Sequence, residues 1–317
     1  MNTVDLDKVK KALVKGEIIA LPTETVYGLA ANIYNDKAIE KIYALKKRPA
    51  YNPLIVHIAS SNILEQVAKK IPTKAKELAD IFWPGALTLV LEKQDQISNR
   101  ITAEKKTVAV RVPNHPLALQ LLNSLNFPLA APSANPFGFI SPTSAEHVAL
   151  YFKKELNFIL DGGPCSHGLE STIIGFQNDK PILYRHGAIA QEEIEKVTGS
   201  ISVKNQNNSS PSAPGMLSRH YAPRTPIQIT KEISNSIEQN RDKKIGVLSF
   251  QKFKNSHSVI NQEVLSISGN LKEAAKNLYA ALHRLDQMNL DLIITSLFPE
   301  KGLGKTINDR LKRAAKK

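Results

Sequence analysis

The spacing of apolar and polar positions along the first two hundred residues predicts a mixture of helices and strands. Apolar residues recur at helical spacing over 4–15, 36–46, 61–69, 73–82, 116–124 and 191–197. Short apolar segments predict strands at 18–21, 53–58, 87–91, 108–112, 158–160, 171–176 and 182–184, and a further apolar run spans 128–131. Because helices and strands are interspersed, we expect an α/β fold with a mixed sheet.

The pattern changes near residue 203. Residues 204–214 are polar and rich in turn-forming residues without an apolar face, which is typical of a linker. Beyond Pro223, expected strands at 226–230, 244–249, 263–267 and 291–297 alternate with expected helices at 231–240, 271–288 and 304–316. This alternation predicts a doubly wound parallel sheet. We therefore expect a first domain at 1–202, a linker at 203–223 and a smaller α/β domain at 224–317.

Charge and cysteine content narrow the class of protein. The 317 residues are 42% hydrophobic, enough for a sizeable core, and they carry a net charge of +13. Such an excess favours anionic partners such as nucleic acid, nucleotides or an acidic membrane surface. The lone Cys165 excludes an internal disulfide and a thiolate zinc cage, and it favours a reducing compartment. No signal peptide is expected, because residues 1–15 carry Asp5 and Asp7 among their lysines and lack a continuous apolar segment. No transmembrane segment is expected either, because the long uncharged stretch 112–145 contains six prolines.

The loop that follows the strand at 18–21 contains two hydroxyl groups, those of Thr23 and Thr25. Ligands bind at strand ends in open α/β sheets, and threonine hydroxyls hydrogen-bond carboxylates or phosphates there. The alternative is a turn whose threonines satisfy the local backbone. Composition alone favours that alternative.

Basic residues follow the helix at 36–46. Lys46, Lys47 and Arg48 stabilise a helix C-terminus without any ligand, and such a run is usually only a solvated face. Equally, an arginine fork and lysine charges suit a polyphosphate. His57 lies on an apolar strand, where a core histidine is more common than a catalytic one.

Arg111 lies inside the apolar strand at 108–112, and a buried arginine requires an anionic partner. Either a ligand carboxylate or a protein carboxylate would serve. Ser133 and Ser141 lie in small, proline-rich loops that leave room for a ligand, although such residues usually only form turns. Arg185 is a second arginine at a strand end.

The segment 302–306 has the sequence Gly-Leu-Gly-Lys-Thr and follows an expected strand, as a phosphate-binding P-loop does. That motif also requires a glycine where this chain has Pro299. We therefore interpret the segment as a loop and a helix start.

Several motifs together resemble the threonylcarbamoyl-AMP synthase family in its long form, with a YrdC-like domain and an extra C-terminal domain. The resemblance covers nearly the whole chain and depends on the order of its motifs. They are Pro22-Thr-Glu-Thr-Val-Tyr-Gly-Leu29, Lys46-x-Arg-Pro49, Asn52-Pro-Leu-Ile-Val-His57, Trp83-Pro-Gly85, Thr107-Val-Ala-Val-Arg111, Ala131-Pro-Ser-Ala-Asn135, Ser141-Pro-Thr143, Glu170-Ser-Thr-Ile173 and Ala213-Pro-Gly-Met-x-x-Arg-His-Tyr-Ala-Pro223. This resemblance implies a twisted mixed sheet with helices around a concave basic cavity.

The resemblance implies a cytoplasmic enzyme that makes L-threonylcarbamoyladenylate and diphosphate from L-threonine, bicarbonate or CO2, and ATP with Mg²⁺. A separate transferase would then modify adenosine 37 of tRNA. The residues that would hold threonine are Thr23, His57, Arg111, Ala131 and Ser171. Those that would hold ATP are Lys46, Arg48, Asn52, Thr107, Ser133, Ser141, Arg185 and Tyr221.

The implied roles are specific. Lys46 and Arg48 would stabilise the departing diphosphate, Arg111 would pair with the threonine carboxylate, and Tyr221 in the linker would fold over the nucleotide. Two other functions compete. One is a non-catalytic RNA-binding module of the same type, and the other is a carbamoyl-transfer enzyme of hydrogenase maturation. The lone Cys165 argues against the latter, since those proteins also carry zinc-finger segments.

Overall fold

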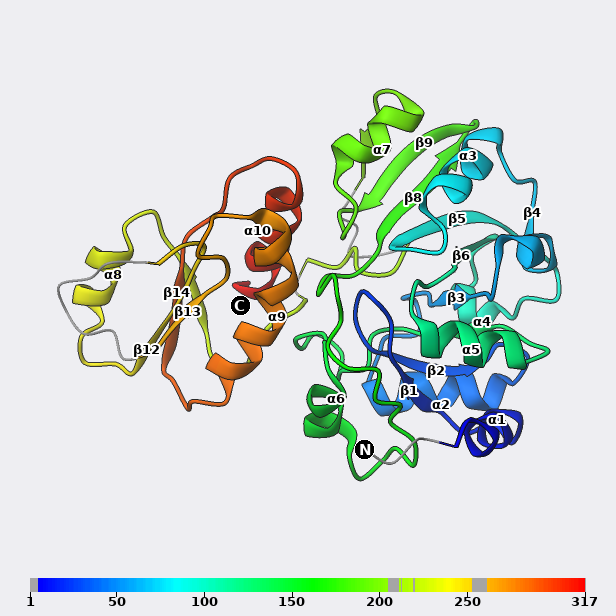
Figure 1. Cartoon of the computed structure of the whole chain (residues 1–317), viewed down its shortest axis with the longest axis horizontal. Coiled ribbons are helices and arrows are strands. Elements are labelled where there is room, and N and C mark those ends of the chain that lie inside the picture. Colours follow the sequence, from blue (N-terminus) through cyan, green and yellow to red (C-terminus); the bar gives the residue numbers. More distant parts are fainter. Residues whose placement is uncertain (1–4, 205–210, 212, 219, 253–260, 317) are drawn as a thin grey trace.

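A computed structural model describes residues 5–204, 211, 213–218, 220–252 and 261–316. Its strands form two sheets (Figure 1). The larger has the order β1-β2-β7-β3-β6-β5-β8-β9-β10, with β4 paired to β5, and the smaller has the order β11-β14-β12-β13.

The larger sheet and its helices make up the N-terminal part. Its strands are β1 (Ile19–Leu21), β2 (Gly28–Asn32), β3 (Ile55–His57), β4 (Ala68–Lys69), β5 (Leu87–Lys93), β6 (Thr107–Arg111), β7 (Leu129–Ala130), β8 (Thr172–Gln177), β9 (Lys180–Arg185) and β10 (Ser202–Val203). Its helices are α1 (Leu6–Val14), α2 (Asp36–Lys46), α3 (Thr73–Phe82), α4 (Asn99–Thr102), α5 (Pro116–Ser124), α6 (Ala145–Phe152) and α7 (Gln191–Thr198), with a 3₁₀ helix at Ser61–Gln66.

The pairing in this sheet is mixed, as expected. Strands β3 and β6 are parallel, and so are β5 and β8, whereas β3–β7, β5–β6 and β8–β9 are antiparallel. The register of β3 and β6 sets His57 opposite Arg111. Residues 107, 109 and 111 share one face of β6, because side chains alternate along a strand.

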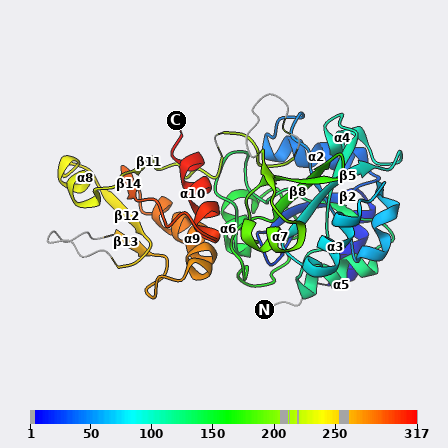
Figure 2. The same cartoon turned by 90° about the horizontal axis from the view of Figure 1, so that it is seen from above.

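The C-terminal part is a parallel sheet with helices on both faces. It contains β11 (Ile227–Ile229), α8 (Ile233–Gln239), β12 (Ile245–Ser249), β13 (Asn261–Val264), α9 (Leu271–Asp286), β14 (Leu292–Thr295) and α10 (Leu303–Ala314). Figures 1 and 2 place α9 and α10 between this sheet and the N-terminal part, with α8 on the other side. The expected doubly wound arrangement is confirmed.

The two parts share an apolar core. Val26, Ile140 and Leu169 of the N-terminal part belong to one buried cluster with Leu278 and Tyr279 of α9. Gly168, at φ +69°, packs so closely that an added Cβ would lie 2.2 Å from the Lys276 carbonyl oxygen of α9. The parts therefore pack directly on each other, while the boundaries at 203 and 223 stay predictions. No described helix is long and apolar enough to cross a membrane.

Several predicted elements were wrong. Residues 61–69 form a 3₁₀ helix followed by β4, because Ala68 and Lys69 pair with the edge of β5. The run at 158–160 makes only an isolated bridge between Ile159 and Ala20. The strand expected at 263–267 begins earlier, as β13.

Other elements were missed. No strand was predicted at β2 and no helix at α6, which follows a proline-rich loop. The Ser144 hydroxyl accepts a hydrogen bond from the His147 amide and caps that helix.

Candidate active site

Loops and strand ends from distant parts of the chain surround one pocket. Its walls include Thr23, Thr25, Val26, Gly28, Arg48, residues 53–55, His57, Arg111, residues 131–133, Glu170, Ser171, Arg185, Pro214, Gly215, His220 and Tyr221. The pocket is narrow, with a cavity volume of about 50 Å³. Thr23, Arg48, Arg111 and Ser133, which sequence analysis assigns to one site, all line it.

Thr23 forms a local turn as well as lining the pocket. Its hydroxyl lies 2.7 Å from the Val26 carbonyl oxygen, to which it donates, and accepts the amides of Thr25 and Val26. The Thr25 hydroxyl in turn accepts from Arg111 over 2.7 Å. The alternative of a threonine that satisfies the local backbone therefore holds for Thr23, whereas the Thr25 hydroxyl binds the distant Arg111. A ligand contact of Thr23 stays a prediction.

Arg111 is paired within the protein. Its Nη2 atom lies 2.6 Å from the Oε1 atom of Glu24, and its Nε atom donates to the Gly85 carbonyl over 3.0 Å. Of the two partners left open by the sequence, the structure supplies a protein carboxylate. The guanidinium still lines the pocket beside His57, its register neighbour.

His57 is a neutral side chain in this pocket. It is fully buried, and burial together with the nearby charge of Arg111 lowers its pKa to about 3. Among the described residues its Nδ1 atom has no hydrogen-bond partner, although it lies in a wall of the cavity. A buried polar atom of this kind requires a ligand or water as its partner.

Arg48 is held in place by the loop that follows it. Its Nε atom donates to the Asn52 carbonyl over 3.1 Å, and its Nη2 atom donates to Asn52 Oδ1 and to the Pro53 carbonyl over 2.7 Å each. Burial lowers the pKa of Arg48 to about 10, so the side chain stays cationic at neutral pH. Asn52 is buried away from the cavity and orients Arg48.

Lys46 does not line the pocket. Its buried ammonium group donates to the carbonyls of Ser133 and Asn135 over 2.5 Å each, behind the loop at 132–135. Burial, and then the charge of Arg48, lowers its pKa. Two of its three N–H groups are thus directed to this loop, and the diphosphate contact expected of Lys46 stays a prediction.

Two further residues expected at the nucleotide also lie outside the pocket wall. The Ser141 hydroxyl donates to Glu170 Oε1 over 2.6 Å and thereby supports a wall residue. Thr107 begins β6, at the other end from Arg111 but on the same sheet face. Ser133 and the backbone of Ala131 do line the pocket.

Ser171 and Arg185 form one unit. The Nε and Nη2 atoms of Arg185 donate to the Ser171 carbonyl over 3.1 and 2.8 Å, and Nη2 also reaches the Ser171 hydroxyl. Arg185 Nη1 donates to the carbonyl of Pro214 in the linker over 3.3 Å. This arginine thus joins the end of β9 to the linker at the pocket.

The linker closes one side of the pocket. Residues 205–210, 212 and 219 lie outside the described residues, but Pro214, Gly215, His220 and Tyr221 line the cavity. Gly215 has φ +79°, and an added Cβ would lie 2.9 Å from the Tyr221 hydroxyl oxygen. In the described part of the chain, neither Tyr221 Oη nor His220 Nδ1 has a hydrogen-bond partner.

Sequence analysis assigned no role to Glu170 and His220, although both line the pocket. Their neighbours Ser171 and Tyr221 were assigned, so adjacency within the same motifs was the available signal. In the described residues no group of His, Cys, Asp or Glu side chains is arranged to hold a metal ion.

Comparison with known proteins identifies the family. A family model described as telomere recombination matches residues 11–187, and one described as threonylcarbamoyl-AMP synthase, C-terminal domain, matches residues 189–316. The threonylcarbamoyl-AMP synthase of Bacillus subtilis is 42% identical, with 99% of this chain and 94% of that protein covered. The chain belongs to the threonylcarbamoyl-AMP synthase family.

Other members of this family agree over almost the whole length. The threonylcarbamoyl-AMP synthase of Pyrococcus abyssi is 42% identical, with 95% of this chain and 91% of that protein covered. The crystal structure of P. abyssi Sua5 complexed with L-threonine has a TM-score of 0.91 and 40% identity, covering 98% of this chain and 94% of that one. The expected family and α/β fold are confirmed.

Proposed function

We propose that this chain makes L-threonylcarbamoyladenylate from L-threonine, bicarbonate or CO2, and ATP, and that the reaction takes place in the pocket described above. One observation carries the assignment of the site. Arg48 follows helix α2, Arg111 ends β6 and Arg185 ends β9, and all three line one narrow cavity. Three converging cations suit a ligand with several negative charges, as a nucleoside triphosphate beside an amino acid is.

Threonine would occupy the end of the pocket at β3 and β6. Arg111 would share its guanidinium between Glu24 and the substrate carboxylate, since an arginine has five donor hydrogens. The neutral His57 offers an unpartnered Nδ1 to a donor of the substrate. Thr23, Ala131 and Ser171 complete this end of the pocket.

ATP would occupy the end of the pocket formed by Arg48, Ser133, Arg185 and Tyr221. The two arginines supply positive charge for the phosphates, and both are fixed by hydrogen bonds before substrate arrives. Lys46 and Asn52 would act behind this wall, by holding the loop at 132–135 and Arg48. Ser141 would do the same through Glu170. An ATP contact of Thr107 would require the nucleotide to extend along β6.

The chemistry requires alignment more than a covalent enzyme intermediate. The threonine amine, as the free base, adds to CO2 and releases one proton to solvent to form a carbamate, and a carbamate oxygen then attacks the α-phosphorus of ATP. A new oxygen–phosphorus bond forms as the bond to the leaving diphosphate breaks. Arg48 and Arg185 would neutralise charge on that leaving group, and a preorganised cation is worth most in a closed, dry pocket.

Mg²⁺ is expected to accompany ATP, but the described residues include no group of side chains arranged to hold the ion. Glu170 is the carboxylate that lines the pocket, and both of its oxygens already accept bonds from Ser141, Tyr279 and Arg310. The ion would therefore be held by the ATP phosphates, and we derive no step through it.

The product would pass to a separate transferase that modifies tRNA, and this sequence of reactions is the reason to propose a cytoplasmic location. The net charge of +13 is consistent with weak RNA binding. The competing function is therefore an RNA-binding module that catalyses no reaction.

Release of diphosphate from ATP separates the two functions. With purified protein, we expect release only when L-threonine and bicarbonate are both present, and no release when either is omitted. Release that is independent of threonine, or RNA binding without any release, would contradict the proposed function.

A further inference from the structure

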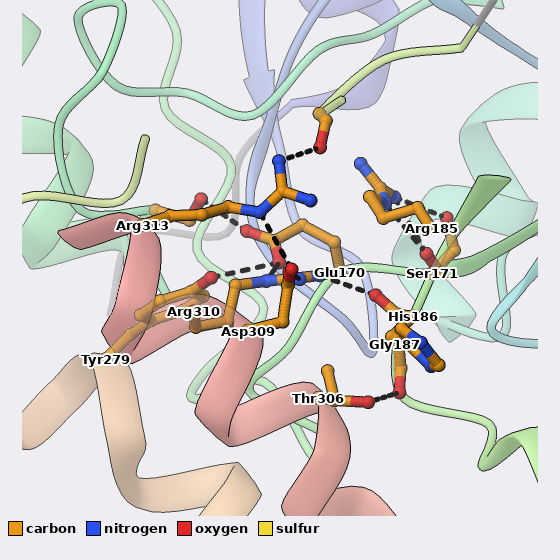
Figure 3. A network of polar contacts seen from close by, with 12 residues as sticks. Glu170, Ser171, Arg185, His186, Gly187, Tyr279, Thr306, Asp309, Arg310 and Arg313 are labelled. Carbon is orange, nitrogen blue, oxygen red and sulfur yellow. Dashed lines mark hydrogen bonds and ion pairs between the residues drawn. The ribbon is translucent and has the colours of Figure 1, made fainter. Parts of the chain in front are cut away.

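Arg310, on helix α10 of the C-terminal part, reaches the pocket wall of the N-terminal part (Figure 3). The side chain is 1% exposed, and its Nε atom lies 3.0 Å from the Oε2 atom of Glu170. Its Nη2 atom donates to the His186 carbonyl over 2.8 Å. Arg310 does not line the pocket, so any influence on the reaction passes through the residues that it holds.

Tyr221 is held by the same guanidinium. The carbon at the centre of that group lies 4.5 Å from the ring centroid of Tyr221, within the range of a cation–π contact. The ring of Tyr279 from α9 stacks on Tyr221 at 5.9 Å. Tyr221 has φ +65°, a conformation that a non-glycine residue keeps only when its surroundings enforce it. Its ring is therefore supported from the C-terminal part, while its hydroxyl group lies in the pocket wall.

A second arginine on the same helix holds a neighbouring segment of the linker, which precedes Tyr221. Arg313 Nη1 donates to the carbonyls of Gly215 and Leu217 over 2.9 and 2.6 Å. Asp309 joins the two arginines, since its Oδ2 atom accepts from Arg310 over 2.6 Å and its Oδ1 atom from Arg313 over 2.9 Å. One turn of α10 thus contacts two linker segments at the pocket, that at Gly215 and Leu217 and that at Tyr221.

Docking of the C-terminal part has further supports. Thr306 donates to the Gly187 carbonyl over 3.0 Å, and Lys305 pairs with Glu192 over 2.7 Å. The shared apolar cluster and the close contact at Gly168 add to these. Since docking has these other supports, the contacts of Arg310 have a more local effect on Tyr221 and Glu170.

We propose that Arg310 is a positioning residue for the reaction: it fixes the Tyr221 ring and the Glu170 carboxylate, so that the C-terminal part completes the nucleotide end of the pocket. Arg313 supports the same state by holding Gly215 and Leu217. This inference rests on the proposed function, because it concerns the same pocket and the same linker.

The test compares the variants Arg310→Met and Arg310→Lys with a control variant, Arg284→Met. The control removes a different arginine–glutamate ion pair of the C-terminal part, Arg284–Glu263. We expect Arg310→Met to raise the KM for ATP at least tenfold with a smaller change in kcat. Arg310→Lys keeps the charge and should recover part of the loss, and Arg284→Met should resemble the unmodified protein.

A double-mutant cycle distinguishes positioning from general loss of structure. Because Arg310 acts in part through Tyr221, adding Arg310→Met to Tyr221→Ala should raise the KM for ATP by a smaller factor than Arg310→Met does alone. Multiplication of the two single effects would overturn the proposal.

Hydrogen exchange of residues 213–218 supplies a readout that does not depend on activity. We expect faster exchange there in Arg310→Met and in Arg313→Met, with the core strands β5 and β8 unchanged. Exchange and KM equal to those of the unmodified protein would overturn the proposal. If Arg310→Met does not fold, the variants Arg310→Lys and Arg313→Met test the proposal by the same two measurements, the KM for ATP and the hydrogen exchange of residues 213–218. Absence of diphosphate release in the unmodified protein would instead contradict the proposed function, and exchange would still test the positioning.

Discussion

The guanidinium of Arg48 donates two hydrogen bonds to Asn52, one to the backbone carbonyl of Asn52 and one to its side-chain oxygen Oδ1. The two residues lie on opposite sides of the turn that follows α2, and Asn52 is completely buried. Arg48 therefore enters the pocket wall in one orientation before any substrate binds. Preorganisation of this kind lowers the cost of stabilising charge that develops during a reaction.

Arg48→Ala should lower threonine-dependent diphosphate release by about 100-fold or more, the scale expected when one preorganised charge donor is removed. The protein should remain folded, as circular dichroism would verify. Arg100→Ala is a matched control, because Arg100 is half-exposed and pairs with Asp36 and Glu40 outside the pocket. Unchanged turnover of Arg48→Ala would remove this residue from the mechanism.

Tyr221→Ala should weaken the retention of ATP, because the linker would lose the ring that closes the pocket. Isothermal titration with a non-hydrolysable ATP analogue measures this effect directly, and we expect at least a tenfold rise in the dissociation constant. Tyr221→Phe keeps the ring and tests the unpartnered hydroxyl group alone. Unchanged affinity for the ATP analogue in Tyr221→Ala would rule out closure of the pocket over the nucleotide by the Tyr221 ring.

Glu170→Gln should destabilise the protein, because it removes one of the two carboxylates, those of Glu170 and Asp309, that pair with the buried Arg310. Asp309 remains, so the loss should lie below the cost of leaving the guanidinium wholly unpaired. Burial alone would raise the pKa of Glu170, but the guanidinium of Arg310, with further help from Arg185 and Ser141, holds it below its ordinary value. Breaking a buried pair costs roughly 3–5 kcal/mol. Urea unfolding measures this loss, and Glu263→Gln, at the half-exposed Arg284, should cost less than about 1 kcal/mol.

The contact between the two parts should weaken at acidic pH through His147 of α6 and His283 of α9. Their rings stack at 3.9 Å across the interface. Burial lowers the pKa of His147 to about 3, with the charges of His283 and Arg284 adding to the effect, and burial lowers the pKa of His283 to about 4. Both pKa values lie below the ordinary histidine pKa of 6.5. At a pH between the lowered values and 6.5, the unfolded chain therefore binds more protons than the folded protein.

Stability from these two rings is therefore fully present above pH 6.5 and is lost as the pH falls toward 4. The loss is at most about 1.4 kcal/mol per histidine for each pH unit. Urea unfolding at pH 7.5, 6.0 and 5.0 checks the slope, and His283→Gln should make it shallower. An identical slope in that variant would show that other groups control the acid response.

The regular elements could be predicted from the sequence where apolar spacing was strong. Helices α2, α3 and α5 agree with their predicted ranges, because each presents a continuous apolar stripe to the core. The two-residue strands β4 and β10 could not be found in the same way. Strand β4 is defined by its pairing with β5, and such a partner is distant in sequence.

The site residues were predictable as a set, because their motifs occur together, but their individual geometry was not. Arg48 and Arg185 do line the pocket, whereas Lys46 is directed to the carbonyls of Ser133 and Asn135. No local pattern distinguishes these cases, since each depends on which loop packs against the side chain. The contacts of Arg310 were equally hidden, because they join residues more than a hundred positions apart.

A crystal structure with L-threonine and a non-hydrolysable ATP analogue tests the central claim most directly. We expect the phosphates against Arg48 and Arg185, the amino acid beside His57 and Arg111, and the ring of Tyr221 over the nucleotide. Density for the nucleotide on another face of the molecule, with this pocket empty, would contradict the account.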